Sequence, residues 1–234
     1  RTAILAGGAA RAASVQLRDK IFAIAAHNLE AAPEDLEIAN AVVSVKGTPT
    51  KSMTLKEIGE IAYKVDLMRS MPADAEPGLE SQVRFSAVNV PAYSNAAHAC
   101  IVEIDPVTCI PEIKRYLVSE DCGNMINPMI VDGQIFGGVV QGLGGVLLEN
   151  STYDADGNPL STTFMDYLLP TTTEVPDIEV DHVITPSSTN PGGYKGVGEG
   201  GAIGSHAAVA NAVMDALWHT GVRATRTPMG PGDI

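Results

Sequence analysis

Residues 191–201 read Pro-Gly-Gly-Tyr-Lys-Gly-Val-Gly-Glu-Gly-Gly, and an apolar helix is predicted directly after them, over residues 202–218. Glycine accepts backbone conformations that other residues avoid, so a glycine-rich run lets a ligand or another backbone come very close. The first turn of a helix also presents free N–H groups and the positive end of the helix dipole, which together favour anions. The stretch therefore predicts a close-contact site at a junction between a loop and a helix.

Within this stretch, Gly196, Gly198 and Gly201 match the G-x-G-x-x-G spacing of dinucleotide-binding folds. In those folds the glycines follow a strand, and an acidic residue lies about 20 residues further on. Here residues 185–191 form a polar, proline-containing loop, and residues 222–227 contain no acidic residue. The sequence therefore argues against a Rossmann-type nucleotide site.

Glu199 is the only acidic residue of the loop. The positive end of the following helix favours a negatively charged side chain at this place, which suits a general base that works near neutral pH. A surface glutamate that only complements the helix dipole is the alternative. The residues alone leave both interpretations open.

A second glycine cluster, residues 134–145, reads Gln-Ile-Phe-Gly-Gly-Val-Val-Gln-Gly-Leu-Gly-Gly and lies in a helix predicted over 129–149. Each glycine inside a helix costs about 1 kcal/mol relative to alanine. Tertiary contacts must compensate, so either another element packs very closely or a ligand touches the backbone. The Gln141 amide, with two donors and one acceptor, suits an uncharged polar group of a ligand. In the packing interpretation, the backbone satisfies this amide.

The composition indicates a globular protein, with 45% hydrophobic and 18% charged residues in 234. The net charge of −13 (15 basic against 28 acidic residues) argues against nucleic acid or an anionic membrane surface as a partner. The longest uncharged apolar stretch, residues 134–148, is too short and too rich in glycine to span a bilayer. Three cysteines without C-x-x-C spacing predict free thiols, no zinc site and a cytoplasmic location.

Apolar periodicity predicts the α+β class, with two α/β lobes. The first lobe, residues 1–66, has the pattern helix, hairpin, helix. Its expected elements are a helix over 3–29, strands over 36–39 and 42–46, a turn at 47–49, and a helix that begins at a Thr54/Glu57 capping box. Residues 67–82 contain two prolines and a glycine without periodicity, which predicts a linker.

The second lobe, residues 83–234, carries both glycine clusters. Its expected strands cover residues 83–88, 98–105, 112–120 and 178–184, the second and third forming a hairpin. Its expected helices cover residues 129–149 and 202–218. The second of these helices is predicted to face inward with Ile203, Ala207, Ala210, Met214 and Leu217.

Several motifs, met in one order along the chain, resemble the molybdenum hydroxylases, the family of xanthine dehydrogenase, aldehyde oxidoreductase and carbon monoxide dehydrogenase. The resemblance is to the C-terminal part of the large subunit, its second molybdenum-cofactor-binding domain. The motifs are Glu120-Asp121-Cys122-Gly123 with Ile126-Asn127-Pro128, Gly133-Gln134 with Gly137-Gly138 and Gln141-Gly142-Leu143-Gly144, Phe164-Met165-Asp166-Tyr167, and residues 195–204 continued by 207–213.

The resemblance implies that the domain binds a molybdenum–pterin cofactor, with the cytosine dinucleotide form as one option. It implies that Glu199 is the general base at the molybdenum centre and that no side chain of this chain ligates the metal. It also places a further set of residues at the cofactor: Gln141, Gly142, Lys195, Gly196, Val197 and Gly198.

The resemblance further implies partners and a substrate class. The chain begins with Arg1 and not with methionine, so we expect a part of a longer protein or a separately encoded subunit that is inactive alone. The expected partners are the remainder of the large subunit and the iron–sulfur and flavin subunits, which carry 2Fe-2S clusters and FAD.

The substrate would be an aldehyde, an N-heterocycle or carbon monoxide, oxidised with oxygen from water. Residues 121–128 and 192–199 look most like the carbon monoxide dehydrogenase-like branch, whereas residues 93–98 depart from the usual family pattern. The five histidines are interpreted as structural residues, with His206 as a neighbour of the catalytic loop. The alternative function is a non-catalytic assembly module that has lost its cofactor.

Overall fold

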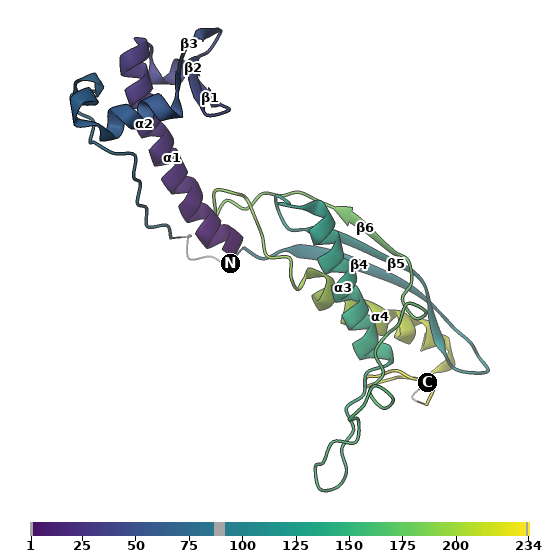
Figure 1. The fold of residues 1–234 in the computed structure, drawn as a ribbon. Helices are drawn as coiled ribbons and strands as arrows, with labels where there is room; N and C mark the ends of the chain where they lie inside the picture. Colours follow the sequence, from purple (N-terminus) through teal and green to yellow (C-terminus); the bar gives the residue numbers. More distant parts are fainter. Residues whose placement is uncertain (1, 87–91, 233) are drawn as a thin grey trace. The chain divides into compact units, whose positions relative to one another are not determined.

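The computed structural model describes residues 2–86, 92–232 and 234 (Figure 1). The chain divides into two compact units, Arg1–Ala87 and Val88–Ile234. Each unit has its own core of buried apolar residues. Mixed helices and sheets in both units confirm the α+β class.

The first unit packs two helices on a small antiparallel sheet of order β1-β2-β3. Its core is built around Ile24 and Ala25 of α1, Val43 of β2 and Ile58 of α2, all 2% exposed or less. Thr54 caps α2 through the predicted capping box, since its side chain accepts from Glu57 N and its own N–H donates to the Glu57 carboxylate. The elements are α1 (Thr2–Leu29), η1 (Pro33–Asp35), β1 (Leu36–Ala39), β2 (Val42–Val45), β3 (Thr48–Thr54), α2 (Leu55–Tyr63) and η2 (Val65–Ser70).

Two parts of this unit differ from the sequence prediction. Residues 48–54 form a third strand, where only a turn at 47–49 was expected, because backbone pairing with β2 holds a segment with little apolar periodicity. The segment interpreted as a linker, residues 67–82, packs on the first core: Met71 is buried, and Leu67, Ala75 and Leu79 cover it. Proline and glycine here bend the chain over the core.

The second unit has a three-stranded sheet with two helices packed on one face. β4 (Asn95–Ile104) pairs antiparallel with β5 (Pro111–Asp121), and β5 pairs parallel with β6 (Ile178–His182). α3 (Pro128–Leu147) and α4 (Gly200–Leu217), followed by η3 (Trp218–Thr220), lie side by side in Figure 1. Side chains from β5, α3 and α4 share one core, whose fully buried members include Tyr116, Ile135, Val139, Val209 and Val213.

The predicted hairpin and helices of this unit are confirmed, but the expected strand over 83–88 is not. Residues 83–86 form no strand, and the last two residues of that range lie outside the described part of the chain. The predicted inward face of α4 is confirmed for Leu217, which is buried, and for Ala210 and Met214, which pack against the core. It is wrong for Ile203 and Ala207, which are exposed, because Gly201, Ser205, Val209 and Val213 take the buried positions. Ile203 is 74% exposed. Small residues therefore take the inner positions where α4 meets α3.

Within the described residues, α3 is the one helix whose length and composition would allow it to span a bilayer. Its apolar side is nevertheless buried by the protein itself, since Ile135, Val139, Leu143 and Val146 are 1% exposed or less. The apolar residues of α3 are therefore explained by its role as a core helix.

Candidate functional site

The crossing of α3 and α4 explains part of the second glycine cluster. A Cβ atom on Gly138 would lie 2.6 Å from Ala202 N and 2.7 Å from the Gly201 carbonyl carbon. One on Gly142 would collide with the side chain of Ser205 and lie 3.1 Å from His206 N. Two backbones thus approach each other here without side chains between them. The packing interpretation holds for Gly138 and Gly142, and Gly142 is buried beneath α4.

The outer side of α3 carries the rest of the cluster. Gly133 and Gly137 are exposed, and a Cβ atom on either would have no neighbour within 4 Å. Gln141, one turn further along, is exposed, and its amide has no hydrogen-bond partner among the residues that the structure describes. The described chain therefore does not account for these glycines or for the amide. An exposed backbone with a free amide fits a ligand or partner that comes close to this face.

Glu199 is the N-cap residue of α4, with its carbonyl accepting hydrogen bonds from Ala202 N and Ile203 N at 3.0 Å each. Its side chain is exposed and makes no capping hydrogen bond. No other described residue pairs with the carboxylate. The Glu199 side chain therefore does not act as a hydrogen-bonding cap. The alternative, a surface glutamate whose charge complements the helix dipole, needs no such bond and stays open.

Gln141 and Glu199 lie on either side of the contact between α3 and α4. The two helices run parallel, because Gly138 meets Ala202 and Gly142 meets Ser205. Gln141 follows Gly138 by three residues, whereas Glu199 precedes Ala202 by three, so the two residues depart from this contact in opposite directions along the helix pair. The contact at Gly138 therefore does not by itself bring the two predicted site residues together.

The other predicted loop residues have distinct environments. Gly196 and Gly198 are exposed, and Gly196 N donates to Ala92 O over 2.9 Å. Val197 is half-buried and packs against the core of the second unit. Gly196 and Gly198 thus present backbone to the outside, whereas Val197 anchors the loop.

Lys195 has a partner within the protein. Its Nζ atom lies 2.9 Å from Asp121 Oδ2, and the two side chains are only 11% and 12% exposed. Burial alone would raise the pKa of Asp121, but hydrogen bonds from Gly123 N, Lys195 and Thr185 outweigh it and hold that pKa well below its ordinary range. The Lys195 ammonium group therefore ties the glycine loop to the end of β5.

We expect Lys195→Met to lower the free energy of unfolding of the second unit by about 3–5 kcal/mol, because Asp121 would stay charged and buried without its partner. The measurement is denaturant unfolding at pH 7, followed by the fluorescence of Trp218, the only tryptophan. The folded-state pKa of Asp121 is lowered from its ordinary value of 3.8. The stabilisation that the ion pair gives is therefore fully present above pH 3.8, and it declines as the pH falls from there toward the folded-state pKa.

The matched control for this substitution is Arg115→Met. Arg115 pairs with Glu179, but both side chains are 52% exposed, and such surface pairs contribute less than about 1 kcal/mol. Equal effects of the two substitutions would contradict a structural role for the Lys195–Asp121 pair.

A buried acid lies beneath the first turn of α4. Glu120 of β5 is fully buried, and a Cβ atom on Gly200 would be 2.5 Å from Glu120 Oε1. His98 of β4 lies under Gly204 and hydrogen-bonds Tyr116 Oη through Nδ1 at 2.9 Å. Sequence reasoning placed Glu120 in a motif but gave it no role. The absence of a side chain at position 200 was the one signal that something fills that space.

The histidines and cysteines form no metal site in the part of the chain that the structure describes. No group of three or more histidine, cysteine, aspartate or glutamate side chains is suitably placed there. His206 Nδ1 lies 3.1 Å from Ala202 O, and its ring packs over Gly145. The three cysteines are free thiols.

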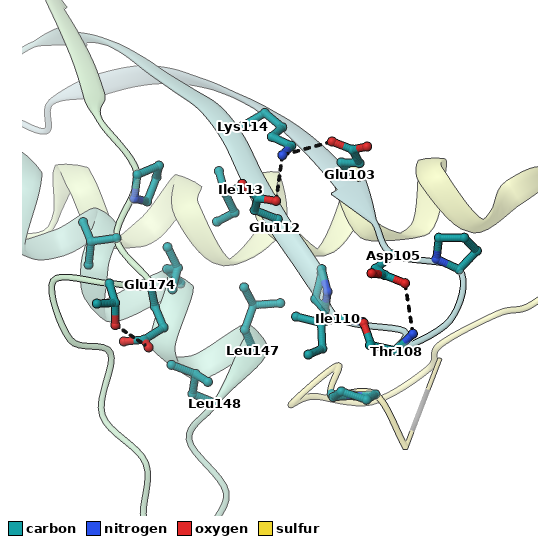
Figure 2. A pocket seen from close by; sticks show the side chains of 18 residues that line it. Glu103, Asp105, Thr108, Ile110, Glu112, Ile113, Lys114, Leu147, Leu148 and Glu174 are labelled. Atoms are coloured by element: carbon teal, nitrogen blue, oxygen red, sulfur yellow. Dashed lines mark hydrogen bonds and ion pairs between the residues drawn. The ribbon is translucent and has the colours of Figure 1, made fainter.

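A separate pocket lies at the C-terminal end of α3. It is lined by apolar side chains, among them Ile113 and Leu147, with Glu103, Glu112 and Lys114 at its edge (Figure 2). Lys114 is held by both glutamates, at 3.0 and 2.6 Å. None of the residues predicted to bind the cofactor or to act in catalysis lines this pocket.

Comparison with known proteins identifies the family of this domain. Residues 1–176 match the family model of the molybdopterin cofactor-binding domain. The chain belongs to this family. The match ends before the loop that carries Glu199, but relatives extend the similarity over nearly the whole chain.

The large subunit of nicotine 6-hydroxylase from Paenarthrobacter nicotinovorans is 42% identical over 93% of this chain and 26% of its own length. The large chain of carbon monoxide dehydrogenase from Hydrogenophaga pseudoflava is 39% identical over 95% and 27%. The crystal structure of quinoline 2-oxidoreductase from Pseudomonas putida 86 has a TM-score of 0.86 at 42% identity, over 100% of this chain and 29% of that one. The chain thus spans slightly more than a quarter of these relatives.

These relatives confirm the resemblance to the molybdenum hydroxylases, including the similarity to carbon monoxide dehydrogenase.

Proposed function

We propose that this chain is the C-terminal portion of the large subunit of a molybdopterin-dependent hydroxylase or dehydrogenase, with Glu199 as its general base. The observation that supports this most strongly is an exposed carboxylate at the N-terminus of α4, without a partner in the described part of the chain and one helical turn from a helix crossing made of glycines. A charged base must face the reacting group and must not be neutralised by a neighbouring cation. The exposure of Glu199 and the lack of a cation beside it among the described residues are consistent with both conditions.

The residues around Glu199 fit the cofactor that the family binds. When bound, this molybdenum–pterin group supplies the redox chemistry of the reaction. Gln141 would hold it through its free amide, and Gly196 and Gly198 would let it approach the backbone of the loop. Gly142 and Lys195 would act indirectly, since one keeps α3 against α4 and the other ties the loop to β5. The cytosine dinucleotide form belongs to the proposal as one option.

The role of Glu199 follows from its surroundings. The Glu199 carboxylate, at the start of α4, would accept a proton at one of its oxygens as the oxygen derived from water is transferred. The proton must then leave before the next turnover. Because the Glu199 side chain is exposed and has no partner among the described residues, it can pass this proton to solvent or to a group that faces the loop.

We propose that the remainder of the large subunit covers this face, and that iron–sulfur and flavin subunits with 2Fe-2S clusters and FAD complete a cytoplasmic enzyme. Large apolar side chains near the site support a covering partner. Ile126, Met129 and Ile130 near the start of α3 are 67%, 77% and 58% exposed, and Ile203 of α4 is 74% exposed. Apolar surface gathered in this way is typical of an interface.

The substrate class is tested with the complete enzyme and an artificial electron acceptor. The substrates are nicotine, quinoline, carbon monoxide and an aldehyde, after the named activities of the relatives and the classes that the family resemblance implies. We expect turnover of at least one, with ¹⁸O from labelled water in the product. Turnover without the label would contradict a hydroxylase mechanism. A non-catalytic assembly module, the alternative, would turn over none of them and would contain no molybdenum.

A further inference from the structure

We propose that Glu120 and Asp121, neighbours at the end of β5, are positioning residues that hold the two ends of the loop carrying Glu199. This inference rests on the proposed function of Glu199. The loop runs from Lys195 to Gly200, and Asp121 contacts the first of these residues while Glu120 lies against the last. Among the described residues the Glu199 side chain has no partner, so the backbone of this loop determines where its carboxylate lies.

Asp121 holds the first end as a charged group. Its Oδ1 atom accepts from Gly123 N at 2.9 Å and from Thr185 N at 3.1 Å, and its Oδ2 atom takes the Lys195 ammonium. Lys195 N also donates to Cys122 O over 2.9 Å. Three segments of the chain thus converge on one nearly buried carboxylate.

Glu120 lies against the second end of the loop. It is fully buried, and both carboxyl oxygens have no hydrogen-bond partner among the described residues. Burial raises the pKa of Glu120, and the charge of Asp121 adds to this, whereas Ser94 and His182 act in the opposite direction. The Glu120 carboxyl group fills the space under Gly200 in which a side chain at position 200 would stand.

The surroundings of Glu120 support a built polar layer under α4. The four buried side-chain atoms without a hydrogen-bond partner in the described chain belong to three residues of the sheet: Glu120 (both oxygens), His98 (Nε2) and His182 (Nδ1). His182 stands beside Glu120 in the β5–β6 register, and its Nε2 atom lies 2.7 Å from Asp132 Oδ1. Buried polar groups destabilise a fold when they lack hydrogen-bond partners, so each of them needs an explanation. Proteins tolerate such a cost mainly at functional sites, and a role under the Glu199 loop would explain it here.

The test is a double-mutant cycle on the complete enzyme, with the best substrate found among nicotine, quinoline, carbon monoxide and an aldehyde. Gly200→Ala pushes the loop away from Glu120, and Glu120→Ala removes its support. We expect each to lower kcat by about 10–100-fold with KM little changed, since a misplacement near 1 Å has effects of that size. The double variant gives the methyl group the space that Glu120 leaves, so its kcat should exceed that of Gly200→Ala. Effects that simply multiply would overturn the inference.

Glu120→Gln keeps the cycle interpretable if an alanine variant fails to fold. Glutamine has the size and shape of the Glu120 side chain, so we expect kcat within about threefold of wild type and an unchanged pH profile, in line with an isosteric replacement. Loss of turnover in Glu120→Gln with molybdenum content intact would show that Glu120 itself exchanges a proton, and would contradict a positioning role. Glu112→Gln, an exposed glutamate on the same strand, is the control.

The Glu199→Gln variant separates failure of this inference from failure of the proposed function. If Glu199→Gln keeps near-normal turnover, the proposed function is wrong, and the role of Glu120 falls with it. If Glu199→Gln is inactive while Gly200→Ala and Glu120→Ala behave independently, only the positioning role is wrong.

Discussion

Glu199→Gln in the complete enzyme is expected to lower kcat by about 10²–10⁴-fold, the range that a general base contributes. Glutamine keeps the shape of the side chain and its place at the N-cap of α4, but its amide cannot accept the proton. Molybdenum and pterin contents should equal those of the wild type, because Glu199 is exposed and holds no part of the fold. Steady-state turnover with an artificial electron acceptor measures kcat, and metal and pterin analysis measures the cofactor content.

Glu37→Gln serves as the control for this substitution, because Glu37 is exposed on β1 of the first unit. It should leave turnover unchanged. Near-normal turnover in Glu199→Gln would remove Glu199 from the mechanism, even if the cofactor is present.

Gly138→Ala is expected to destabilise the second unit by about 3 kcal/mol, the upper part of the range for overpacked interiors. The added methyl group would meet the backbone of Gly201 and Ala202 at 2.6–2.8 Å, and backbone cannot move aside as a flexible side chain can. Denaturant unfolding of the 234-residue chain, followed by Trp218 fluorescence, gives the change. Trp218 directly follows α4 and therefore reports on this unit.

Gly137→Ala, one residue away on the same helix, is the matched control for Gly138→Ala. Its methyl group has no neighbour within 4 Å, so the higher helix propensity of alanine should stabilise α3 by about 1 kcal/mol. A stabilising Gly138→Ala, or two substitutions with the same effect, would show that α3 and α4 are not packed backbone to backbone.

The opposite signs expected for Gly137 and Gly138 also show where sequence reasoning reached its limit. The propensity of glycine predicts that the cluster in residues 134–145 needs compensation, and both kinds of compensation that were considered fit the structure. Gly138 and Gly142 pack on α4, whereas Gly133 and Gly137 face outward. Periodicity alone cannot assign each glycine to one kind, because that depends on where α4 lies.

The site residues divide in the same way. Glu199 and Gln141 could be singled out from the sequence as candidates, because an acid on a glycine loop and an amide within a glycine helix are local features. The partners of the loop were not, because Asp121 and Lys195 are 74 residues apart in sequence. Likewise, Glu120 meets Gly200 only because β5 ends under the start of α4. Long-range packing decides such contacts, and a single sequence does not display it.

Strong local signals predicted real elements, but the lack of a local signal did not mean that a segment was unstructured. The capping box at Thr54 and the hairpin of β4 and β5 are fully encoded in short stretches, and the structure confirms both. Strand β3 lacks apolar alternation, and Met71 lies in a segment whose apolar residues have no regular spacing and are interrupted by turn formers. Both follow from tertiary contacts that outweigh the local pattern.

The central claim is that this chain forms part of the pocket of a molybdenum–pterin cofactor in an active enzyme. The most direct test is the molybdenum and pterin content of the complete large subunit, purified with its partner subunits. The account predicts close to one molybdenum and one pterin per large subunit, with less of both in Gln141→Ala. Purified wild-type protein that is fully folded and assembled but contains neither would contradict it.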